Sequence, residues 1–319
     1  MGLAVATALS ACSDWEVHIL DINRDNGSQV AKSLARTTFH YADVTKYKVL
    51  GEAFQKCFQA HKRIDFVFAN AGMIERVNFY DTHPISTGET VAPPPEPDLL
   101  SIDADLKGVI LTTYLAQHYF RASPNQGAGS SIVMTASCGG LYPSFYSPLY
   151  SSAKCEFIFG VIPFLEFLFV ISGRGKSLNS IIIPCADSFC IVGVVGFMRS
   201  IAQHFKAGGI RANAICPGIV RTNLVDQNGW DAFPQHRFTD MEAVVRVVLQ
   251  LADADEPAGQ GLTDARGSHL PTESLFGLAV EISDSGVYFR EQHEFCDDGM
   301  REVMAATILE NQVGAILNQ

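Results

Sequence analysis

The sequence predicts an α/β fold built on a doubly wound parallel sheet. Short apolar segments alternate with helical segments along the chain, which is typical of parallel α/β proteins. Most of the apolar segments are apolar on both faces, as strands covered by helices on both sides must be. The 319 residues, 47% of them apolar and 18% charged, suit a globular chain with a sizeable core.

Five strands are expected, each a short apolar run that ends in polar or turn-forming residues. Runs of this length, bounded by Gly, Pro, Asn or Asp, are typical of buried strands. They span 17–20, 39–42, 66–69, 131–134 and 212–215, and are followed by Asp21, Asp43, Asn70-Ala71-Gly72, Ser137 and Pro217-Gly218. Ligands bind at the carboxyl ends of the strands in open α/β sheets, so these residues are expected to form one cleft.

The expected helices carry apolar residues at helical spacing. Four apolar positions at i, i+3, i+4 and i+7 predict a first helix from residue 2, and they are Val5, Ala8, Leu9 and Cys12. The same stretch imitates a signal peptide or a myristoylation site. However, no Lys or Arg precedes the apolar run, and Ala6 stands where Ser or Thr is needed. Further helices are expected at 29–36, 49–61, 106–120, 193–205 and 241–252.

Charge and cysteine content exclude several classes of protein. A net charge of −11 argues against a nucleic-acid surface, which needs a positive field, and indicates solubility without pointing to a partner. The eight cysteines show neither a CxxC pair nor regular spacing, so neither a disulfide framework nor a metal site is expected. Scattered thiols in a chain of this size are typical of a reducing compartment, and we expect a cytoplasmic protein.

Tyr150 and Lys154 are spaced so that they share one face of a helix. An ammonium held near a phenol favours the phenolate and lowers the pKa of the phenol. A phenol tuned in this way can exchange a proton with an alcohol or carbonyl oxygen. The spacing alone also fits an ordinary surface helix, but Ser137, at the end of a strand, adds a hydroxyl that can bind the same oxygen.

Several motifs follow one another as they do in one enzyme family, and apart from one insert their spacing also matches. These motifs are Asn70-Ala71-Gly72, Ser137, Tyr150-x-x-x-Lys154 and Pro217-Gly218. The chain resembles the short-chain dehydrogenase/reductase family from Gly2 to about residue 301. The resemblance implies a Rossmann-like sheet. Residues 287–290 and the Pro-rich segment 92–97 look most like NAD-dependent hydroxyprostaglandin dehydrogenases and their fungal relatives.

The resemblance also implies roles for individual residues. Tyr150 would be the general acid/base, Lys154 would lower its pKa and hold the nicotinamide ribose, and Ser137 would orient the substrate oxygen. Hydride transfer would belong to the cofactor. The implied cofactor-binding residues are Gly2, Asp21, Asp43, Val44, Asn70, Ala71, Gly72, Tyr150, Lys154, Pro217, Gly218, Ile219 and Thr222, with Asp43 and Val44 at the adenine and Thr222 at the nicotinamide amide.

Asp21 bears on the choice of cofactor. A carboxylate at the end of this strand accepts hydrogen bonds from a ribose 2′-hydroxyl and repels a 2′-phosphate, which favours NAD over NADP. Arg24, three residues later, keeps NADP as the alternative. Asp21 can also be a plain turn residue at a strand end.

Two departures from the family pattern concern the site. Gly2 takes the place of the last glycine of the phosphate-binding turn, and no counterpart of the usual first strand stands ahead of it. The strands beside that position are therefore expected to lack their central partner. Asp105 stands where the family usually has Asn, and an ionised Asp cannot donate as an amide does. The family's proton relay at Asp105 is therefore in doubt, unless the backbone carbonyl serves instead.

Residues 155–192 separate Lys154 from a segment that the family carries on the same helix. They hold six of the 21 phenylalanines and three of the eight cysteines. We favour a translated intron, because codons for Cys155-Glu156-Phe157 and for Ile191-Val192 can contain splice signals. The alternatives are a folded insertion, a phosphate loop at 173–177 and a transmembrane helix, which Glu156, Pro163 and Glu166 would interrupt.

The chain is expected to be one dinucleotide-binding and catalytic domain, 1–319, with the insert at 155–192 and a smaller one or a surface loop at 260–276. The expected activity is NAD(P)-dependent interconversion of a secondary alcohol and a ketone. Aromatic residues between Ser137 and Tyr150 favour a medium-sized apolar substrate, and the fungal resemblance suggests secondary metabolism. A homo-oligomer is implied by resemblance. The alternatives are a degenerate family member without activity and a membrane-anchored dehydrogenase.

Overall fold

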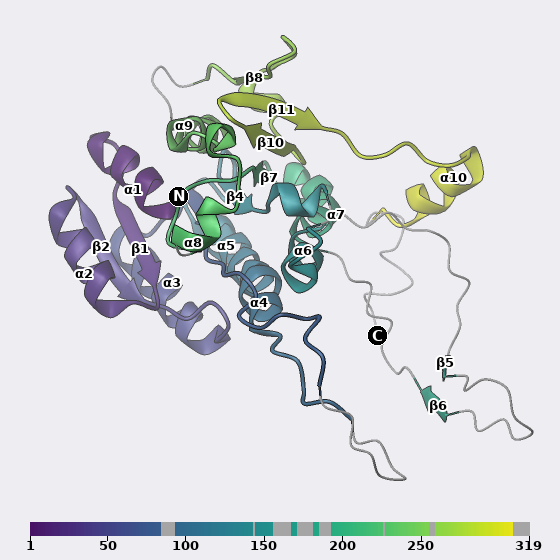
Figure 1. The fold of residues 1–319 in the computed structure, drawn as a ribbon. Coiled ribbons are helices and arrows are strands. Elements are labelled where there is room, and N and C mark those ends of the chain that lie inside the picture. The colour runs from purple at the N-terminus through teal and green to yellow at the C-terminus, as the bar shows by residue number, and fades with distance from the viewer. Residues whose placement is uncertain are drawn as a thin grey trace, which may run out of the picture.

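The computed structural model describes residues 1–83, 93–142, 144–155, 167–170, 181–184, 193–225, 227–254 and 259–308. Its central sheet has five strands in the order β11-β10-β7-β4-β3 (Figure 1). The strands are β3 (Phe66–Ala69), β4 (Ser131–Thr135), β7 (Arg211–Pro217), β10 (Ala279–Ser283) and β11 (Gly286–Arg290). The pairs β3–β4, β4–β7 and β7–β10 are parallel, whereas β11 pairs antiparallel to β10. The α/β fold class predicted from the sequence is confirmed.

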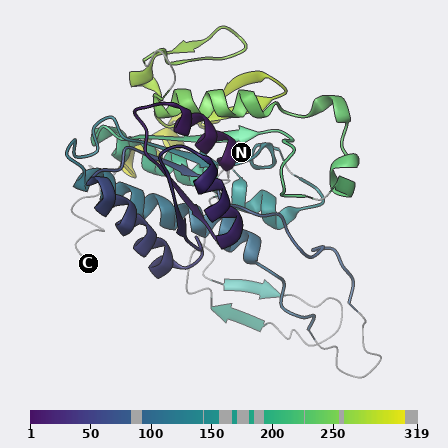
Figure 2. The ribbon, with the colours of Figure 1, turned by 90° about the vertical axis from the view of Figure 1, so that its left-hand side faces the viewer.

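Helices cover both faces of this sheet, so the sheet is doubly wound (Figures 1 and 2). On one face, α3 (Tyr47–His61), α5 (Gly108–Ala122) and α7 (Val194–Ala207) pack on Ile132 and Met134. On the other face, α1 (Gly2–Ala11) and α9 (Met241–Ala252) pack on Val133. Successive residues of β4 therefore point into two different cores, which is why this strand is apolar throughout.

The two remaining expected strands form a sheet of their own. β1 (Val17–Asp21) and β2 (Thr37–Tyr41) pair in parallel and are flanked by α2 (Arg24–Ser33). A cavity of about 980 Å³ is lined by all of β1 on one side and by all of β3 on the other. The sheet of the described residues is therefore divided between β1 and β3.

Two expected helices differ from the structure in how their first turns form, and two others, α3 and α7, begin two residues earlier and one residue later than expected. The expected helix at 29–36 is α2, which begins at Arg24, because the Asn23 side chain accepts the Asn26 N–H and caps it. The expected helix at 106–120 is divided into a π-helical turn, Asp103–Lys107, and α5 from Gly108. A π-helical turn rotates its side chains relative to a regular helix.

The helix that carries Tyr150 and Lys154 ends before the insert. It is α6 (Pro148–Lys154), and Cys155 already has an extended backbone. Gly193, which precedes α7, lies directly against it, because a Cβ on Gly193 would be 2.4 Å from the Cys155 nitrogen. Within 155–192, β5 (Phe167–Val170) and β6 (Ile181–Pro184) pair antiparallel, and the proposed splice ends and the 173–177 loop lie outside the described residues.

Residues 260–276 are packed against the domain. They form the small hairpin of β8 (Leu262–Thr263) and β9 (His269–Leu270), followed by a 3₁₀ turn, Thr272–Ser274. Leu262 and Leu275 are buried, and the Asn213 side chain donates to the Leu275 carbonyl at 2.8 Å. The single domain and the two inserts stay predictions.

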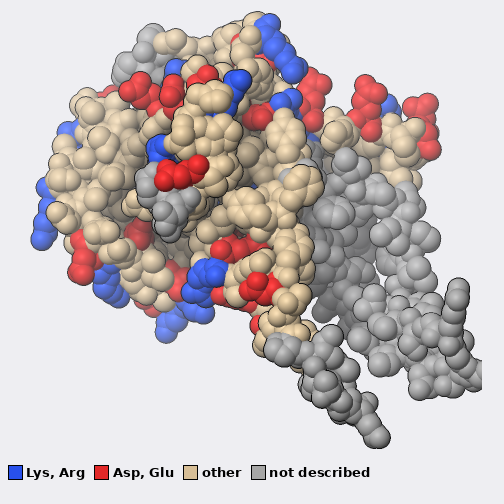
Figure 3. Space-filling model, in the orientation of Figure 1, with Lys and Arg blue, Asp and Glu red and all other residues tan. Residues whose placement is uncertain are grey.

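Three further helices complete the described chain: α4 (Leu100–Ile102), α8 (Gln227–Asp231) and α10 (Asp298–Ala306). On the face drawn in Figure 3, basic side chains are scattered among acidic ones. No helix in the described ranges is both long enough and apolar enough to cross a membrane. Most of the segment 155–172, on which a membrane anchor would depend, lies outside those ranges.

Candidate active site

The expected site residues gather at the carboxyl edge of the central sheet. Asn70 follows β3, and the Thr135 hydroxyl at the end of β4 donates to its side-chain oxygen at 3.2 Å. The Lys154 ammonium donates to the Thr135 carbonyl at 2.8 Å. Because β3 and β4 are parallel neighbours with Ala69 opposite Met134, the contact between Asn70 and Thr135 follows from the sheet register.

Ser137 and Tyr150 come from two short elements that pack together. Ser137 precedes a 3₁₀ turn, Cys138–Gly140, and its hydroxyl oxygen accepts the Gly139 N–H at 3.1 Å. Pro148 begins the helix of Tyr150, where its fixed backbone angle suits a first turn. Burial raises the pKa of Tyr150 to about 12, while a hydrogen bond with Ser137 acts in the opposite direction.

The effect of Lys154 on Tyr150 stays a prediction. The Lys154 ammonium lies 5.9 Å from the centre of the Tyr150 ring and donates to the Thr135 carbonyl. Burial is the larger influence on the phenol, so Tyr150 is protonated at neutral pH in this state.

Asp105 and Lys154 are buried near each other and interact electrostatically. Both side chains are almost fully buried, and burial lowers the pKa of Lys154 while the Asp105 charge raises it. Burial raises the pKa of Asp105 to about 6, against the opposing effects of Lys154 and of the Met73 N–H, which donates to Oδ1 at 2.7 Å. Its Oδ2 is buried without a hydrogen-bond partner in the described structure.

Gly72 makes this arrangement possible. A Cβ at that position would lie 2.5 Å from the Asp105 Oδ1 and 3.6 Å from the Lys154 ammonium. The Asn-Ala-Gly motif thus brings its last residue against the buried pair. Asp105 is therefore part of the site even though it differs from the family's Asn.

The residues expected at the adenine end lie on the separate two-stranded sheet and just after it. Asp21 is exposed at the end of β1, and its Oδ1 accepts the Asn23 N–H at 2.7 Å. Asp43 follows β2, and its Oδ1 accepts the N–H and the hydroxyl of Thr45. This oxygen of Asp43 thus shapes a turn, while Val44 packs against Gly108.

Gly2 links the two ends of the expected cleft. It begins α1 and faces the Asn70 amide, because a Cβ there would lie 3.1 Å from Nδ2. The 980 Å³ cavity runs along this region, and its lining includes Gly2, Asp21, Val44, Asn70 and Ala71. Its volume lies near the upper end of the range of about 300–1,000 Å³ typical of small-molecule sites.

The loop after β7 is held in place by backbone contacts. The Gly218 N–H donates to the Ile282 carbonyl at 2.8 Å, and the Ile219 carbonyl accepts the Thr239 N–H at 2.7 Å. Pro217 is the last residue of β7. The Thr222 hydroxyl oxygen accepts the Leu224 N–H at 3.2 Å, so its own hydrogen stays available for a ligand.

Two acidic residues near the site were missed by the sequence analysis. Glu75 accepts the Tyr150 N–H at 3.4 Å through Oε2, and its Oε1 is buried without a partner in the described structure. Glu281 on β10 forms an ion pair with Arg290 and accepts the Tyr142 hydroxyl at 3.2 Å. Neither contact has a local signal in the sequence, because the partners are distant along the chain or on different strands.

The residues present fit a nicotinamide dinucleotide in most of its parts. A buried ammonium and a buried carboxylate oxygen without a partner in the described structure lie at the expected nicotinamide end, and Gly72 lets both side chains approach the backbone. Asp21 lies at the ribose end, and the N-terminus of α1 offers backbone N–H groups to a phosphate. The earlier glycines of the phosphate turn have no counterpart in this chain.

A doubly wound sheet with Ser, Tyr and Lys gathered at its carboxyl edge defines a nucleotide-dependent oxidoreductase. Residues 1–166 match the family model described as short chain dehydrogenase. The chain is also 62% identical over 318 residues to short-chain dehydrogenase/reductase prx7 of Penicillium rubens, covering 100% of both chains. The protein therefore belongs to the short-chain dehydrogenase/reductase family, as its motifs predicted.

More distant relatives agree with this assignment. The human 15-hydroxyprostaglandin dehydrogenase [NAD(+)] is 26% identical over 234 residues, which is 71% of this chain and 66% of that protein. The crystal structure of gox2181 is similar in fold, with a TM-score of 0.56, 21% identity and coverage of 79% of this chain and 83% of the other. The full-length match to prx7 leaves no room for a gap as long as 155–192, so that relative carries a counterpart of this segment.

Proposed function

We propose that this protein interconverts a secondary alcohol and a ketone with NAD as its cofactor. The observation that carries the proposal is the grouping of Tyr150, hydrogen-bonded with Ser137, and the buried Lys154 at one edge of the sheet. NAD would supply hydride transfer to or from the substrate carbon. The protein's part is to hold the substrate oxygen and to move one proton.

Tyr150 is the proton-transfer group in this proposal. Its phenol is protonated at neutral pH in the free protein, the form that donates a proton to the oxygen of a ketone. The Ser137 oxygen accepts the Gly139 N–H, and its hydroxyl hydrogen, which is donated to the Cys138 sulfur at 4.0 Å in the structure, would turn to the same substrate oxygen. In the reverse direction Tyr150 first loses its proton to solvent, and the phenolate then takes the proton from the alcohol.

The substrate is proposed to be medium-sized and apolar. Phe145 and Tyr146 lie between Ser137 and Tyr150, and both are exposed. The Tyr146 ring lies 6.5 Å from that of Phe233, a residue that follows α8. Exposed aromatic rings beside a catalytic group favour apolar ligands. Pro143, expected in the same surface, lies outside the described residues. A role in fungal secondary metabolism is part of the proposal, supported by the fungal relatives.

The preference for NAD rests on Asp21, and Arg24 is the residue that would permit NADP. The Arg24 guanidinium stacks on the Tyr41 ring at 3.7 Å, at the end of β2. We expect NAD⁺ to bind at least tenfold more tightly than NADP⁺, which corresponds to a difference in binding free energy of about 1.4 kcal/mol. Asp21→Ser should reduce this ratio, because removing the carboxylate removes its repulsion of a 2′-phosphate. An unchanged ratio in this variant would remove Asp21 from the proposal.

The test of the proposed function is NADH binding, followed by fluorescence, together with turnover on a panel of apolar secondary alcohols. Tyr150→Phe should retain binding and lose turnover, whereas Tyr114→Phe, an exposed tyrosine on α5, should change neither. A second protein should carry a strand and Gly-rich turn ahead of Met1 and lack 156–192. Failure of both proteins to bind NADH would overturn the proposal.

A second candidate is a family member that has lost activity. It is favoured by the division of the sheet between β1 and β3. Binding of NADH by the repaired protein alone would select this candidate for the present chain. The retained Ser137, Tyr150 and Lys154 oppose it, because a protein without activity has no need of all three.

Location and assembly complete the proposal. Cys12, Cys57, Cys138, Cys216 and Cys296 form no disulfide in the described ranges, which supports a reducing compartment such as the cytoplasm. A homo-oligomer is proposed from the family, in which the helix that corresponds to α6 often pairs. Light scattering on the purified chain tests this, and a monomer would contradict it.

A further inference from the structure

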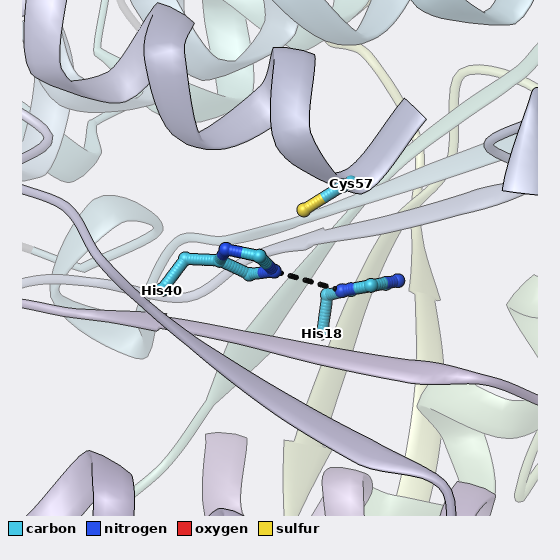
Figure 4. Close-up of side chains that lie close together, drawn as sticks. All are labelled: His18, His40 and Cys57. Atoms are coloured by element: carbon cyan, nitrogen blue, oxygen red, sulfur yellow. Dashed lines mark hydrogen bonds between the residues drawn. The ribbon is translucent and has the colours of Figure 1, made fainter. Parts of the chain in front are cut away.

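Three side chains that bind metals well lie together far from the catalytic residues in the chain. His18 is on β1, His40 is on the neighbouring strand β2, and Cys57 is on α3, which packs over both. The nitrogen and sulfur atoms that each residue can offer lie within 4.8 Å of one another. In Figure 4 the Cys57 sulfur points from α3 toward the two imidazole rings.

The distances are close to those of a metal centre. His18 Nδ1 and His40 Nε2 are 2.9 Å apart and share a hydrogen bond. Two imidazole nitrogens on one tetrahedral zinc ion are about 3.3 Å apart, and a thiolate sulfur lies about 3.6 Å from each. An ion would therefore take the place of the shared proton, with side-chain shifts of about 1 Å.

Hydrogen bonding does not fully satisfy this cluster. His18 Nε2 is buried without a partner in the described structure, and a buried polar atom of this kind costs free energy. His18 and Cys57 both line the 980 Å³ cavity, which gives an ion a path to the cluster. His61, one helical turn after Cys57, also lines it, and its ring centre is 5.4 Å from that of His18.

We propose that His18, His40 and Cys57 bind a zinc-type divalent cation, with His61 as the nearest donor for the fourth position. Cys57 loses its thiol proton to solvent when the sulfur binds, and the proton shared by the two imidazoles moves to the outer nitrogen of its own ring, so each ion releases one proton. The positive charge of Lys56, near His40, weakens cation binding, whereas the negative charge of the Cys57 thiolate strengthens it. The ion joins β1, β2 and α3, and so stabilises the small sheet that has no strand partner toward β3.

The test is zinc binding by the full-length chain, measured by titration calorimetry and by zinc K-edge X-ray absorption. We expect one equivalent of zinc per chain, with one sulfur and at least two imidazoles around the ion. Cys57→Ser and His18→Ala should each lower the affinity at least a hundredfold, and His61→Ala should lower it less. Lys56→Ala should raise the affinity, because it removes a positive charge.

The matched control is Cys296→Ser, which changes an exposed thiol and should leave zinc affinity unchanged. Cobalt offers a second readout, because a thiolate-to-cobalt charge-transfer band should appear in the parent chain and be absent from Cys57→Ser. Zinc bound only by oxygen or nitrogen, or affinity unchanged in Cys57→Ser, would overturn the proposal. X-ray absorption on the parent chain tests whether sulfur and imidazole bind the zinc even where a variant fails to fold.

Discussion

Excising residues 156–192 and joining Cys155 to Gly193 is expected to stabilise the fold. A Cβ on Gly193 would lie 2.4 Å from the nitrogen and 2.5 Å from the oxygen of Cys155, so the two backbones are already in contact. A single peptide bond separates consecutive Cα atoms by about 3.8 Å, which such neighbours can meet with a small adjustment. The join would connect α6 to α7 through two residues.

The magnitude follows from the length removed. The excised segment has 37 residues, counted from 156 to 192 inclusive. If the segment contributes only the entropy of loop closure, a loop of that length costs about (3/2)RT ln 37, or about 3 kcal/mol, which the shortened chain no longer has to supply. At about 2 °C per kcal/mol for a chain of this size, the midpoint of thermal unfolding should rise by about 6 °C.

Urea unfolding followed by tryptophan fluorescence measures this change. Trp15 and Trp230 are the two tryptophans of the chain, and both lie outside the excised segment, so the same probes report on both proteins. A control in which 156–192 is replaced by a Gly/Ser sequence of equal length should unfold close to the parent. An excised protein that unfolds at or below the parent's urea midpoint would refute the reasoning, because the segment would then contribute stabilising contacts.

Three further predictions concern buried groups. Folding raises the pKa of Asp105 from 3.8 to about 6, so its contribution to stability is present below pH 3.8 and lost as the pH rises through 6. The free energy of unfolding of the parent, measured in urea, should therefore fall by up to about 3 kcal/mol between pH 4 and pH 8, whereas that of Asp105→Asn should not. Arg290→Met should destabilise the fold by about 2 kcal/mol by leaving the Glu281 carboxylate buried and unpaired, and the double variant with Glu281→Gln should recover part of that loss in thermal unfolding. Gly72→Ala should lower the free energy of unfolding in urea by about 1–3 kcal/mol and weaken NADH binding, because its Cβ would displace the Asp105 carboxylate. An unchanged free energy and unchanged binding would contradict the 2.5 Å contact.

Strong periodic segments were predicted well because local pattern and tertiary packing agree there. α9 begins and ends at the predicted residues, and β3 spans the predicted range. α2 was placed too late because Asn26, Gly27 and Ser28 suggest a turn. In the structure Gly27 lies under the Phe39 ring, where a Cβ would be 2.1 Å from a ring carbon, so packing against β2 requires glycine inside the helix.

The grouping of the candidate site residues was predictable only where they are close in sequence or lie at the ends of strands. Tyr150 and Lys154 are one helical turn apart, and Ser137 ends a strand, so their grouping follows from sequence order and sheet direction. Glu75 reaches Tyr150 across 75 positions of the chain, and no pattern in the sequence indicates such a contact. The raised pKa of Asp105 could not be predicted from the sequence either, because it depends on burial beside Lys154 rather than on its neighbours in the chain.

The divided sheet changes which contacts hold the cofactor site together. Asp21, Asp43 and Val44 belong to the β1–β2 unit, whereas Ser137 and Tyr150 belong to the five-stranded sheet, and no described strand pairing joins the two. Side-chain packing of α1 and α3 against the central layers supplies the connection instead. Packing between helices tolerates small shifts that a hydrogen-bonded ladder does not. The distance between the adenine end and the nicotinamide end is therefore set by helix packing, so core substitutions in α1 or α3 should weaken NADH binding without touching a cofactor-binding residue.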